Sequence, residues 1–335
     1  MGTQVGKQTI KFDNMPKIIS HAAITGPKEG EGPLASYFDQ VLEDVLWGED
    51  SWEKAESKIL KEAILMAIKK ANLNLSDIRY VFSGDLLSQL IGSTFALRAL
   101  SIPFFGLYGA CSTMGESLIL SAMTVDAGFA DYCVAATSSH FCGAEKQFRF
   151  PLEYGSQRPP TSSWTVTGSG SAIVSKVGDG PKITYAIPGK IIDLGAKDPM
   201  DMGAAMAPAA ADTIVTFLKD TGKQPSDLDM IATGDLGKYG RKLVIELVKQ
   251  EGYDLGSNYI DCGIEIFDAV TQNTYAGGSG CGCSAVTLAG YILKKMSDKE
   301  INNLLFIPTG ALLSPVSSNE GESIPGIAHG VVLEN

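Results

Sequence analysis

The chain has 335 residues, of which 44% are hydrophobic and 37 are glycine, and its formal net charge is −11. This length and apolar content allow one large or two ordinary compact domains with a buried core. The acidic balance argues against nucleic-acid binding, which needs a basic surface, and the sequence has no apolar run long enough for a membrane-spanning helix.

The N-terminal segment and the cysteines indicate the compartment. Residues 1–12 are polar and carry no apolar stretch after their lysines, so we expect no secretory signal. Six cysteines lie in apolar or glycine-rich segments without the spacing of a disulfide framework: Cys111, Cys133, Cys142, Cys262, Cys281 and Cys283. We therefore expect reduced thiols, as is typical of a cytosolic protein.

Helices and strands are expected to alternate through the first half of the chain. A helix is predicted over 51–71, because small and apolar residues recur on one helical face: Ala55, Ile59, Ala63, Met66 and Ala67. Strands are predicted at 80–83, 103–108 and 132–137, with a helix over 112–127 before the last of them. This alternation predicts an α/β protein built from βαβ units, with largely parallel strands.

The second half of the chain repeats the order of the first, which indicates an internal duplication. Four pairs of segments recur in the same order: Ser76-Asp77-Ile78 with Ser226-Asp227-Leu228, Gly84-Asp85-Leu86 with Gly234-Asp235-Leu236, Cys111-Ser112 with Cys283-Ser284, and Gly170-Ser171-Ala172-Ile173 with Gly330-Val331-Val332-Leu333. A cluster of turn residues at 178–181 lies between the copies. We predict two similar halves, 1–179 and 180–335, related by a pseudo-dyad.

A duplicated βαβ half with a cysteine just before a helix resembles the thiolase superfamily, and its layout is similar to thiolases and β-ketoacyl-ACP synthase III. The resemblance implies a five-layered αβαβα fold, in which residues 108–112 form the nucleophile elbow around Cys111. The N-terminus of a helix stabilises a thiolate, so we expect the pKa of the Cys111 thiol to be lowered.

A condensing enzyme of this superfamily needs a base or oxyanion donors beside its thiol. The resemblance places the family histidine after the strand at 230–233, where this chain has Gly234 and Asp235, and the family asparagine at 280–282, which reads Gly-Cys-Gly. We therefore expect a ligand-binding protein that has lost the condensing machinery. The alternatives are an acyltransferase in which Cys111 works with other helpers, such as His140, and a structural subunit with a vestigial cavity.

Segments across nearly the whole chain are similar to a family of sporulation proteins within this superfamily. They include Gly26-Pro27-Lys28-Glu29, Ser83-Gly84-Asp85-Leu86-Leu87, Gly109-Ala110-Cys111-Ser112-Thr113 and Ala276-Gly277-Gly278-Ser279-Gly280-Cys281. The resemblance implies the component that binds dipicolinic acid within a complex of membrane proteins, which moves this ligand into the developing spore. It also implies a peripheral position at the inner spore membrane.

Several residues are candidates for the ligand site. Cys111 is expected to line it, and Cys283 opens the matching helix of the second half. Asp85 and Asp235 follow matching strands and could hold Ca²⁺ that enters with the ligand, or could cap the helix or turn that follows. The spacing of Cys281 and Cys283 favours packing in a tight helix turn over a metal site.

The segment 141–165 is expected to be a loop that carries basic and aromatic side chains, with His140 before it as a possible donor to the ligand or a hydrogen-bonded loop residue. These side chains are Lys146, Arg149, Arg158, Phe148, Phe150, Tyr154 and Trp164. An arginine can fork a carboxylate while rings stack on a planar ligand, so this mixture suits an aromatic dicarboxylate. The same mixture also suits a loop at a dimer contact.

A homodimer is the expected assembly. Proteins of this superfamily usually pair the edge strands that correspond to 103–108. Phe104, Phe105 and Leu107 make that strand apolar enough for the contact.

Overall fold

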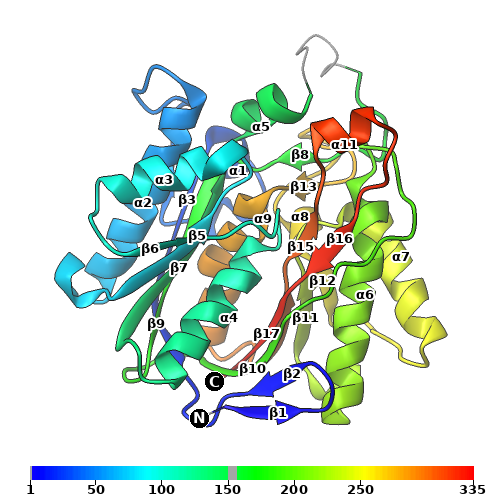
Figure 1. Ribbon diagram of the computed structural model, residues 1–335. Coiled ribbons are helices and arrows are strands. Elements are labelled where there is room, and N and C mark those ends of the chain that lie inside the picture. The colour runs from blue at the N-terminus through cyan, green and yellow to red at the C-terminus, as the bar shows by residue number, and fades with distance from the viewer. Residues whose placement is uncertain (1, 150–156) are drawn as a thin grey trace.

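Helices and strands form five layers in this computed structural model, which describes residues 2–149 and 157–335 (Figure 1). Two pairs of helices cover the outer faces: α2 (Trp52–Lys70) and α3 (Ile91–Arg98) on one side, α6 (Met202–Thr221) and α7 (Gly237–Gln250) on the other. Between the two halves of the sheet lie α4 (Thr113–Asp126) and α9 (Cys281–Val286). The αβαβα arrangement predicted from the sequence is confirmed.

The two sides of the sheet have the same strand order, read outward from the centre. One side runs β3 (Lys17–Thr25), β9 (Gly168–Ser175), β7 (Tyr132–Ser139), β5 (Tyr80–Gly84) and β6 (Phe104–Gly106). The other runs β10 (Lys182–Ile187), β17 (Gly330–Glu334), β14 (Asn303–Ile307), β11 (Met230–Thr233) and β12 (Tyr259–Asp261). The sides meet where Lys182 of β10 pairs with Lys17 of β3. The division into 1–179 and 180–335 stays a prediction.

Strand direction is only partly as expected. The outer strands β7, β5 and β6 are parallel, as are β14, β11 and β12. The inner pairs are antiparallel, however: β9 runs opposite to both β3 and β7, and β17 opposite to both β10 and β14. The reason is that the segments 140–167 and 308–329 re-enter the sheet at the end they left, which makes antiparallel neighbours.

The remaining elements are short. At the N-terminus β1 (Thr3–Val5) and β2 (Thr9–Lys11) form a hairpin beside β10. The others are α1 (Pro27–Gly30), β4 (Gln40–Val41), α5 (Phe141–Phe148), β8 (Trp164–Thr165), α8 (Cys262–Glu265), β13 (Gly278–Ser279), a π-helical turn (Thr287–Ile292), α10 (Leu293–Ser297), β15 (Thr309–Ala311), α11 (Pro315–Asn319) and β16 (Gly326–Ala328), with 3-10 turns at Ala35–Tyr37, Leu75–Asp77, Ser88–Leu90 and Pro225–Asp227. No helix in the described ranges combines the length and apolar content needed to cross a membrane.

One local structure appears in both halves. The 3-10 turns before β5 and β11 are each closed by a capping box, in which the aspartate at the third position receives the N–H of the residue before the turn. Asp77 accepts from the backbone of Asn74 at 2.7 Å, and Asp227 accepts from the backbone of Gln224 at 2.8 Å. The repeated Ser-Asp signal of the sequence therefore corresponds to the same turn in both copies.

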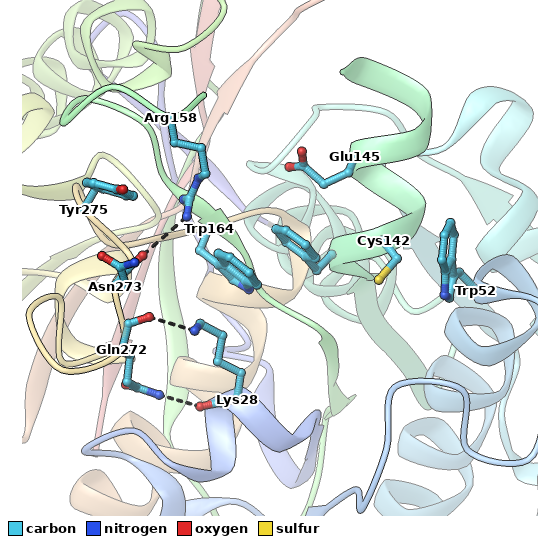
Figure 2. A pocket seen from close by; sticks show the side chains of 10 residues that line it. Lys28, Trp52, Cys142, Glu145, Arg158, Trp164, Gln272, Asn273 and Tyr275 are labelled. Atoms are coloured by element: carbon cyan, nitrogen blue, oxygen red, sulfur yellow. Dashed lines mark hydrogen bonds between the residues drawn. The ribbon is translucent and has the colours of Figure 1, made fainter. Parts of the chain in front are cut away.

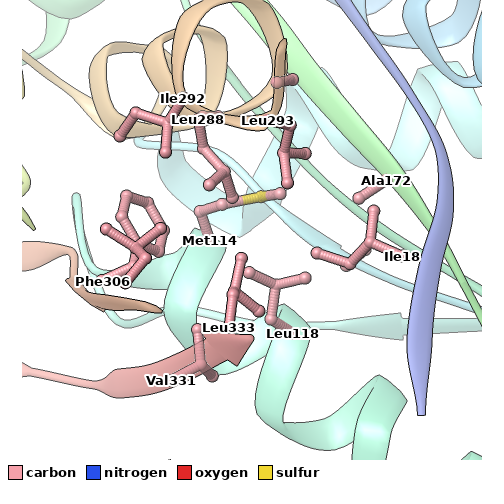
Figure 3. Packing of buried hydrophobic residues seen from close by; sticks show 14 of the residues in the cluster. Ile18, Met114, Leu118, Ala172, Leu288, Ile292, Leu293, Phe306, Val331 and Leu333 are labelled. Atoms are coloured by element: carbon pink, nitrogen blue, oxygen red, sulfur yellow. The ribbon is translucent and has the colours of Figure 1, made fainter. Parts of the chain in front are cut away.

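The central core is packed around α4. Met114 and Leu118 lie fully buried among side chains from both sides of the sheet, including Ile18 of β3, Phe306 of β14 and Leu333 of β17 (Figure 3). The π-helical turn contributes two further buried leucine and isoleucine side chains to this cluster. Because α4 begins just after Cys111, this packing fixes the position of the elbow.

The segment 141–165 is not entirely a loop, contrary to the prediction. Its first eight residues form α5, whose apolar side chains Phe141, Ala144 and Phe148 have helical spacing. Trp164 and Thr165 form β8, which pairs in parallel with β13. The helix places Glu145 and Arg149 four residues apart, where they form an ion pair.

Candidate functional site

Cys111 lies in the tight turn that precedes α4. Ala110 has a φ of 48°, in the left-handed region that residues other than glycine rarely adopt. The hydroxyl of Thr113 donates to the Ala110 carbonyl at 2.6 Å and closes the turn. Gly310 of β15 packs directly against it, since a Cβ there would collide with the Gly109 carbonyl oxygen. The elbow geometry that the resemblance implied is thus present.

Two side chains from the second half of the chain contact the Cys111 thiol. Cys281, the first residue of α9, is one of them, and its own thiol donates to the Ala110 carbonyl at 3.0 Å. Asp235, which follows β11, is the other. The resemblance places the family asparagine within 280–282 and the family histidine just after the strand 230–233, so these two side chains come from the two segments in question. We call Cys111, Cys281 and Asp235 the thiol centre.

The Asp235 carboxylate is held by hydrogen bonds on both oxygens. Oδ2 accepts from the Ser279 hydroxyl at 2.7 Å and from the Gly280 N–H at 3.0 Å, and Oδ1 accepts from the Thr309 hydroxyl at 2.7 Å. The side chain is only 2% exposed, and this burial raises its pKa despite the hydrogen bonds. These three donors hold the carboxyl group in place, so it is not free to move as a general base.

The expected lowering of the Cys111 pKa is wrong. Contact with Cys281, burial and the nearby carboxyl group of Asp235 together raise the pKa well above the ordinary value of a cysteine. The helix dipole does not compensate, because the thiol stands before the N-cap of α4 and next to a negative group. Cys111 is therefore a protonated thiol at neutral pH.

The cavity beside the thiol centre is small. Its volume is about 40 Å³, and Cys111, Tyr108, Phe148 and Arg149 are among the residues that line it. A water needs about 10–15 Å³ by this measure, so the cavity has room for about three waters. Arg149 was a predicted ligand residue and does line the cavity, but its guanidinium is bound to Glu145 at 2.6 Å.

Asp85, for which the sequence left open a ligand site or a cap of the following helix or turn, holds a helix end. Its Oδ1 accepts from the N–H of Leu87 at 2.9 Å, and its Oδ2 accepts from both the N–H and the hydroxyl of Ser93 at 2.7 Å. It does not line the cavity beside Cys111. Across residues 2–149 and 157–335, no cluster of three or more histidine, cysteine or acidic residues is arranged to hold a metal ion.

His140 and Cys283 do not line this cavity either. The Nε2–H of His140 donates to the Val45 carbonyl at 2.7 Å, and burial lowers the pKa of the ring, so it is neutral. Cys283 belongs to the central core, with its thiol 3.7 Å from the Gly234 carbonyl oxygen. Of the six residues proposed from the sequence, the structure brings Cys111, Asp235 and Arg149 together.

A second and larger pocket opens between α1, α5, β8 and the turn before β13 (Figure 2). Its volume is about 580 Å³, and we call it the aromatic pocket; its lining residues are Lys28, Trp52, Phe141, Cys142, Glu145, Arg158, Trp164, Gln272, Asn273 and Tyr275. Phe141 and Trp164 stack in parallel with ring centroids 3.7 Å apart. Glu145 lines both this pocket and the small cavity, so the two are neighbours.

Two positive side chains converge on the rings of the aromatic pocket. The Nζ of Lys28 lies 4.4 Å from the centre of the Trp164 ring, and the guanidinium carbon of Arg158 lies 4.9 Å from the same centre. Arg158 is also 5.0 Å from the ring of Tyr275, so it lies between two aromatic rings. Sequence analysis had singled out Arg158 and Trp164.

Lys28, Gln272 and Tyr275 were missed as site residues. The only signal for Lys28 was its place in the segment 26–29, which was quoted for the family resemblance alone. Gln272 and Tyr275 lie in a turn without periodicity, and only the folded chain brings them to β8. Two aromatic residues proposed from the sequence, Phe150 and Tyr154, lie outside the described residues.

The five layers, the matched strand order and the elbow cysteine define a thiolase-like fold, and solved structures share it. The 3-oxoacyl-[acyl-carrier-protein] synthase III of Aquifex aeolicus is similar with a TM-score of 0.58 and 12% identity, covering 96% of this chain and 100% of that one. Cerulenin-bound OleA of Xanthomonas campestris is similar with a TM-score of 0.62 and 14% identity, covering 96% and 98%. Identities this low show the fold alone.

Sequence comparison then gives the family. The family model for stage V sporulation protein AD matches residues 6–334. Stage V sporulation protein AD of Bacillus subtilis (strain 168) is 45% identical over 329 residues, which cover 98% of this chain and 97% of that protein. The chain belongs to the stage V sporulation protein AD family, as the resemblance of its segments implied.

Proposed function

We propose that this protein binds dipicolinic acid and is the ligand-binding component of the SpoVA complex, which moves that acid into the developing spore. Family membership supports a role in sporulation. The observation that supports a binder rather than an enzyme is the thiol centre, because the segments where the family has its histidine and asparagine bring Asp235 and Cys281 to Cys111 instead. A protonated Cys111 is a poor nucleophile towards an acyl thioester, and the one carboxyl group beside it, Asp235, raises the pKa of the thiol and is itself held by three donors.

The proposal includes a peripheral position at the inner spore membrane, with the membrane proteins of the SpoVA complex as partners. The protein would then receive or deliver its ligand at their surface. The two carboxylates of dipicolinate are hard oxygen ligands of the kind that Ca²⁺ prefers, so the ligand is to be compared with and without this ion.

Isothermal titration of the purified protein with dipicolinate, with and without Ca²⁺, tests the proposal. We expect saturable heat with one site per chain. Benzoate at the same concentrations is the control for non-specific effects of an aromatic acid. The absence of saturable heat at millimolar dipicolinate, both with and without Ca²⁺, would contradict the proposal.

The strained elbow favours a second candidate function, an acyltransferase that uses Cys111. Ala110 is held in a left-handed conformation at the position where this fold presents its nucleophile, and such strain often accompanies function. Incubation with acyl-CoA or acyl carrier protein, followed by mass spectrometry of the intact chain, tests this candidate. An acyl adduct that disappears in Cys111→Ala would favour the enzyme over the binder.

A further inference from the structure

A groove opens on the outer side of the molecule where α6 and α7 lie (Figure 1). These two helices and the segment 190–194 border it; its volume is about 680 Å³, and we call it the α6 groove. Its apolar lining residues are Ile192, Leu194, Pro208, Ala211, Val215 and Leu247. The groove shares no lining residue with the aromatic pocket or with the cavity beside Cys111, so it is a separate feature of the molecule.

The internal duplication shows which helix of the first half corresponds to α6. The 3-10 turns that follow α2 and α6 are 150 positions apart (225 − 75), and so are the first residues of the two helices (202 − 52). Every buried position of α2 is also buried in α6 at this offset: 55, 56, 57, 59, 60, 63, 64, 67 and 68. The inner faces of α2 and α6 therefore match, and their outer faces can be compared position by position.

The outer face of α6 has lost charges that the outer face of α2 keeps. Lys58 and Lys61 are half-buried lysines of α2, and the ammonium of Lys58 lies 4.8 Å from the centre of the Trp47 ring. At the offset of 150 the same positions of α6 are Pro208 and Ala211. Lysine keeps a helix face in water, whereas proline and alanine are short and apolar. The groove lies where these long charged side chains are missing.

The apolar surface of the groove continues on the neighbouring segment. Pro208, Ala211 and Val215 form a stripe along α6 with the spacing i, i+3 and i+7. Beside it, Ile191 is 62% exposed and Leu194 is 72% exposed. A stripe of this kind next to exposed large apolar side chains is typical of a surface that another molecule covers.

The charges of the groove favour a protein partner. Its lining carries three lysines and three acidic residues: Lys7, Lys190, Lys219, Asp212, Asp220 and Glu251. This balance does not suit nucleic acid or anionic lipid, which need a basic surface, and the net charge of −11 opposes the approach of a second copy. Among the described residues Lys7 forms no ion pair, so a partner that carries a carboxylate would be complementary to it.

The local backbone favours a helix as the bound segment. No lining residue of the groove belongs to a strand, so an extended peptide finds no strand edge with which to pair. A helix forms its own backbone hydrogen bonds and can place apolar side chains along a groove at i, i+3 or i+4, and i+7. Pro208 has no N–H to donate to the Ala204 carbonyl, which leaves that acceptor to a side chain of the partner.

We propose that the α6 groove binds an amphipathic helix of another protein. The apolar side of that helix packs on Pro208, Ala211 and Val215, and a carboxylate of the helix meets Lys7. The inference goes beyond ligand binding and does not depend on it, because the groove is separate from both pockets around the thiol centre and α5.

Photo-cross-linking of the full chain in its own sporulating cells tests the groove. The probe is benzoylphenylalanine in place of Thr216, a half-buried residue of the lining. The matched control carries the same group in place of Met66, the corresponding and equally half-buried residue of α2. We expect an adduct with one protein from position 216 and only background from position 66. Mass spectrometry of the adduct should identify a peptide with apolar residues at helical spacing and an acidic residue.

Two substitutions in the groove should lower the yield of that adduct. Leu194→Asp places a charge at an exposed position of the border, and Ala211→Lys restores the residue type that α2 has at Lys61. We expect each to reduce the yield by about tenfold or more, because burial of one leucine side chain corresponds to at least that factor. Val177→Asp is the control, since Val177 is 60% exposed and lies outside the groove.

Thermal melting of the purified variants checks that they fold, and Leu194→Asp, at an exposed position, keeps the test open if Ala211→Lys does not. Equal yields at positions 216 and 66 would overturn the inference. So would an adduct with lipid or with a second copy of the chain, a cross-linked peptide without helical spacing, or a yield that both groove variants leave at the level of Val177→Asp. Titration with dipicolinate is a separate measurement, so failure of the proposed function would leave this inference standing.

Discussion

The thiol of Cys111 lies against the carboxyl group of Asp235, although the two residues are 124 positions apart (235 − 111). After the contact with Cys281 and burial, this neighbour is a further reason for the raised pKa of the thiol, because a negative group disfavours the thiolate.

Asp235→Asn should therefore make Cys111 more reactive. Without the negative charge the pKa of the thiol falls, and the thiolate fraction at pH 8 rises. The rate of carbamidomethylation by iodoacetamide, followed peptide by peptide with mass spectrometry, should increase at Cys111 in the variant. Cys142, which is partly exposed and far from Asp235 in the sequence, is the internal control. Equal Cys111 rates in both proteins would contradict this account.

Gly310→Ala should destabilise the protein and distort the elbow. The added Cβ would collide with the backbone oxygen of Gly109, which cannot move without shifting the turn around Cys111. We expect a loss of about 1–3 kcal/mol in the free energy of unfolding, measured by urea denaturation.

Gly143→Ala is the matched control for that substitution. Its new Cβ would come no closer than 3.7 Å to any neighbour, and the site lies inside α5. Alanine in a helix interior is favoured over glycine by about 0.5–1 kcal/mol, so this variant should be slightly more stable. If Gly310→Ala were as stable as Gly143→Ala, the prediction would be contradicted, because the turn around Cys111 would then shift without loss of stability.

Glu29 should make stability depend on pH in the neutral range. Its side chain is 1% exposed, and burial raises its pKa from 4.5 to about 7, although its Oε1 accepts the N–H of Thr167 at 2.9 Å. Between these values the unfolded chain releases the proton and the folded chain keeps it. The wild type therefore loses stability as pH rises from about 4.5 to about 7, by up to about 3 kcal/mol from this group.

The variant Glu29→Gln isolates that contribution. Other buried carboxyl groups with raised pKa, such as Asp261, remain in both proteins and cancel in the difference. Urea unfolding at pH 5, 6, 7 and 8 should show that the free energy of unfolding of the variant rises relative to that of the wild type as pH increases. Two parallel stability profiles over this range would mean that Glu29 is ionised in the folded protein.

The edge strand β6 is the proposed contact between two copies of the chain. It ends the sheet on one side, and Phe105 is 51% exposed while its ring stacks on Phe82 at 5.0 Å. We expect the wild type to sediment at twice the chain mass of 35.4 kDa, and Phe105→Lys to sediment as a monomer. Phe129→Lys is the control, because Phe129 is also exposed but lies outside β6. A wild-type monomer would refute the dimer.

The sequence alone located the elements that have strong periodicity or a repeated signal. The helix predicted over 51–71 is α2, and the strand expected at 230–233 is β11. It failed at α5, where two helical turns gave too short a pattern to separate from a loop. Only part of the aromatic pocket could be predicted from the sequence, because Arg158 and Trp164 are close to each other along the chain while Lys28 is distant from both.

The partner of Cys111 could not be read from the repeat either. Matching the two halves by residue type aligned Cys111 with Cys283, but Cys281 makes the contact because α9 begins there. A step of two residues along a helix changes the direction of the side chain by about 200°. Cys281 therefore points to the thiol centre and Cys283 into the core. Such a shift depends on where the helix starts, which the sequence leaves open to within a few residues.

The thiol centre is assembled from three segments that are distant along the chain, the turn before α4, the end of β11 and the start of α9. No part of the chain folding alone could bring them together. The shielding of Cys111 is thus a property of the complete tertiary structure, and it vanishes whenever either half of the sheet comes apart. A rise in the labelling of this one cysteine as denaturant is added should therefore report the separation of the two halves of the sheet.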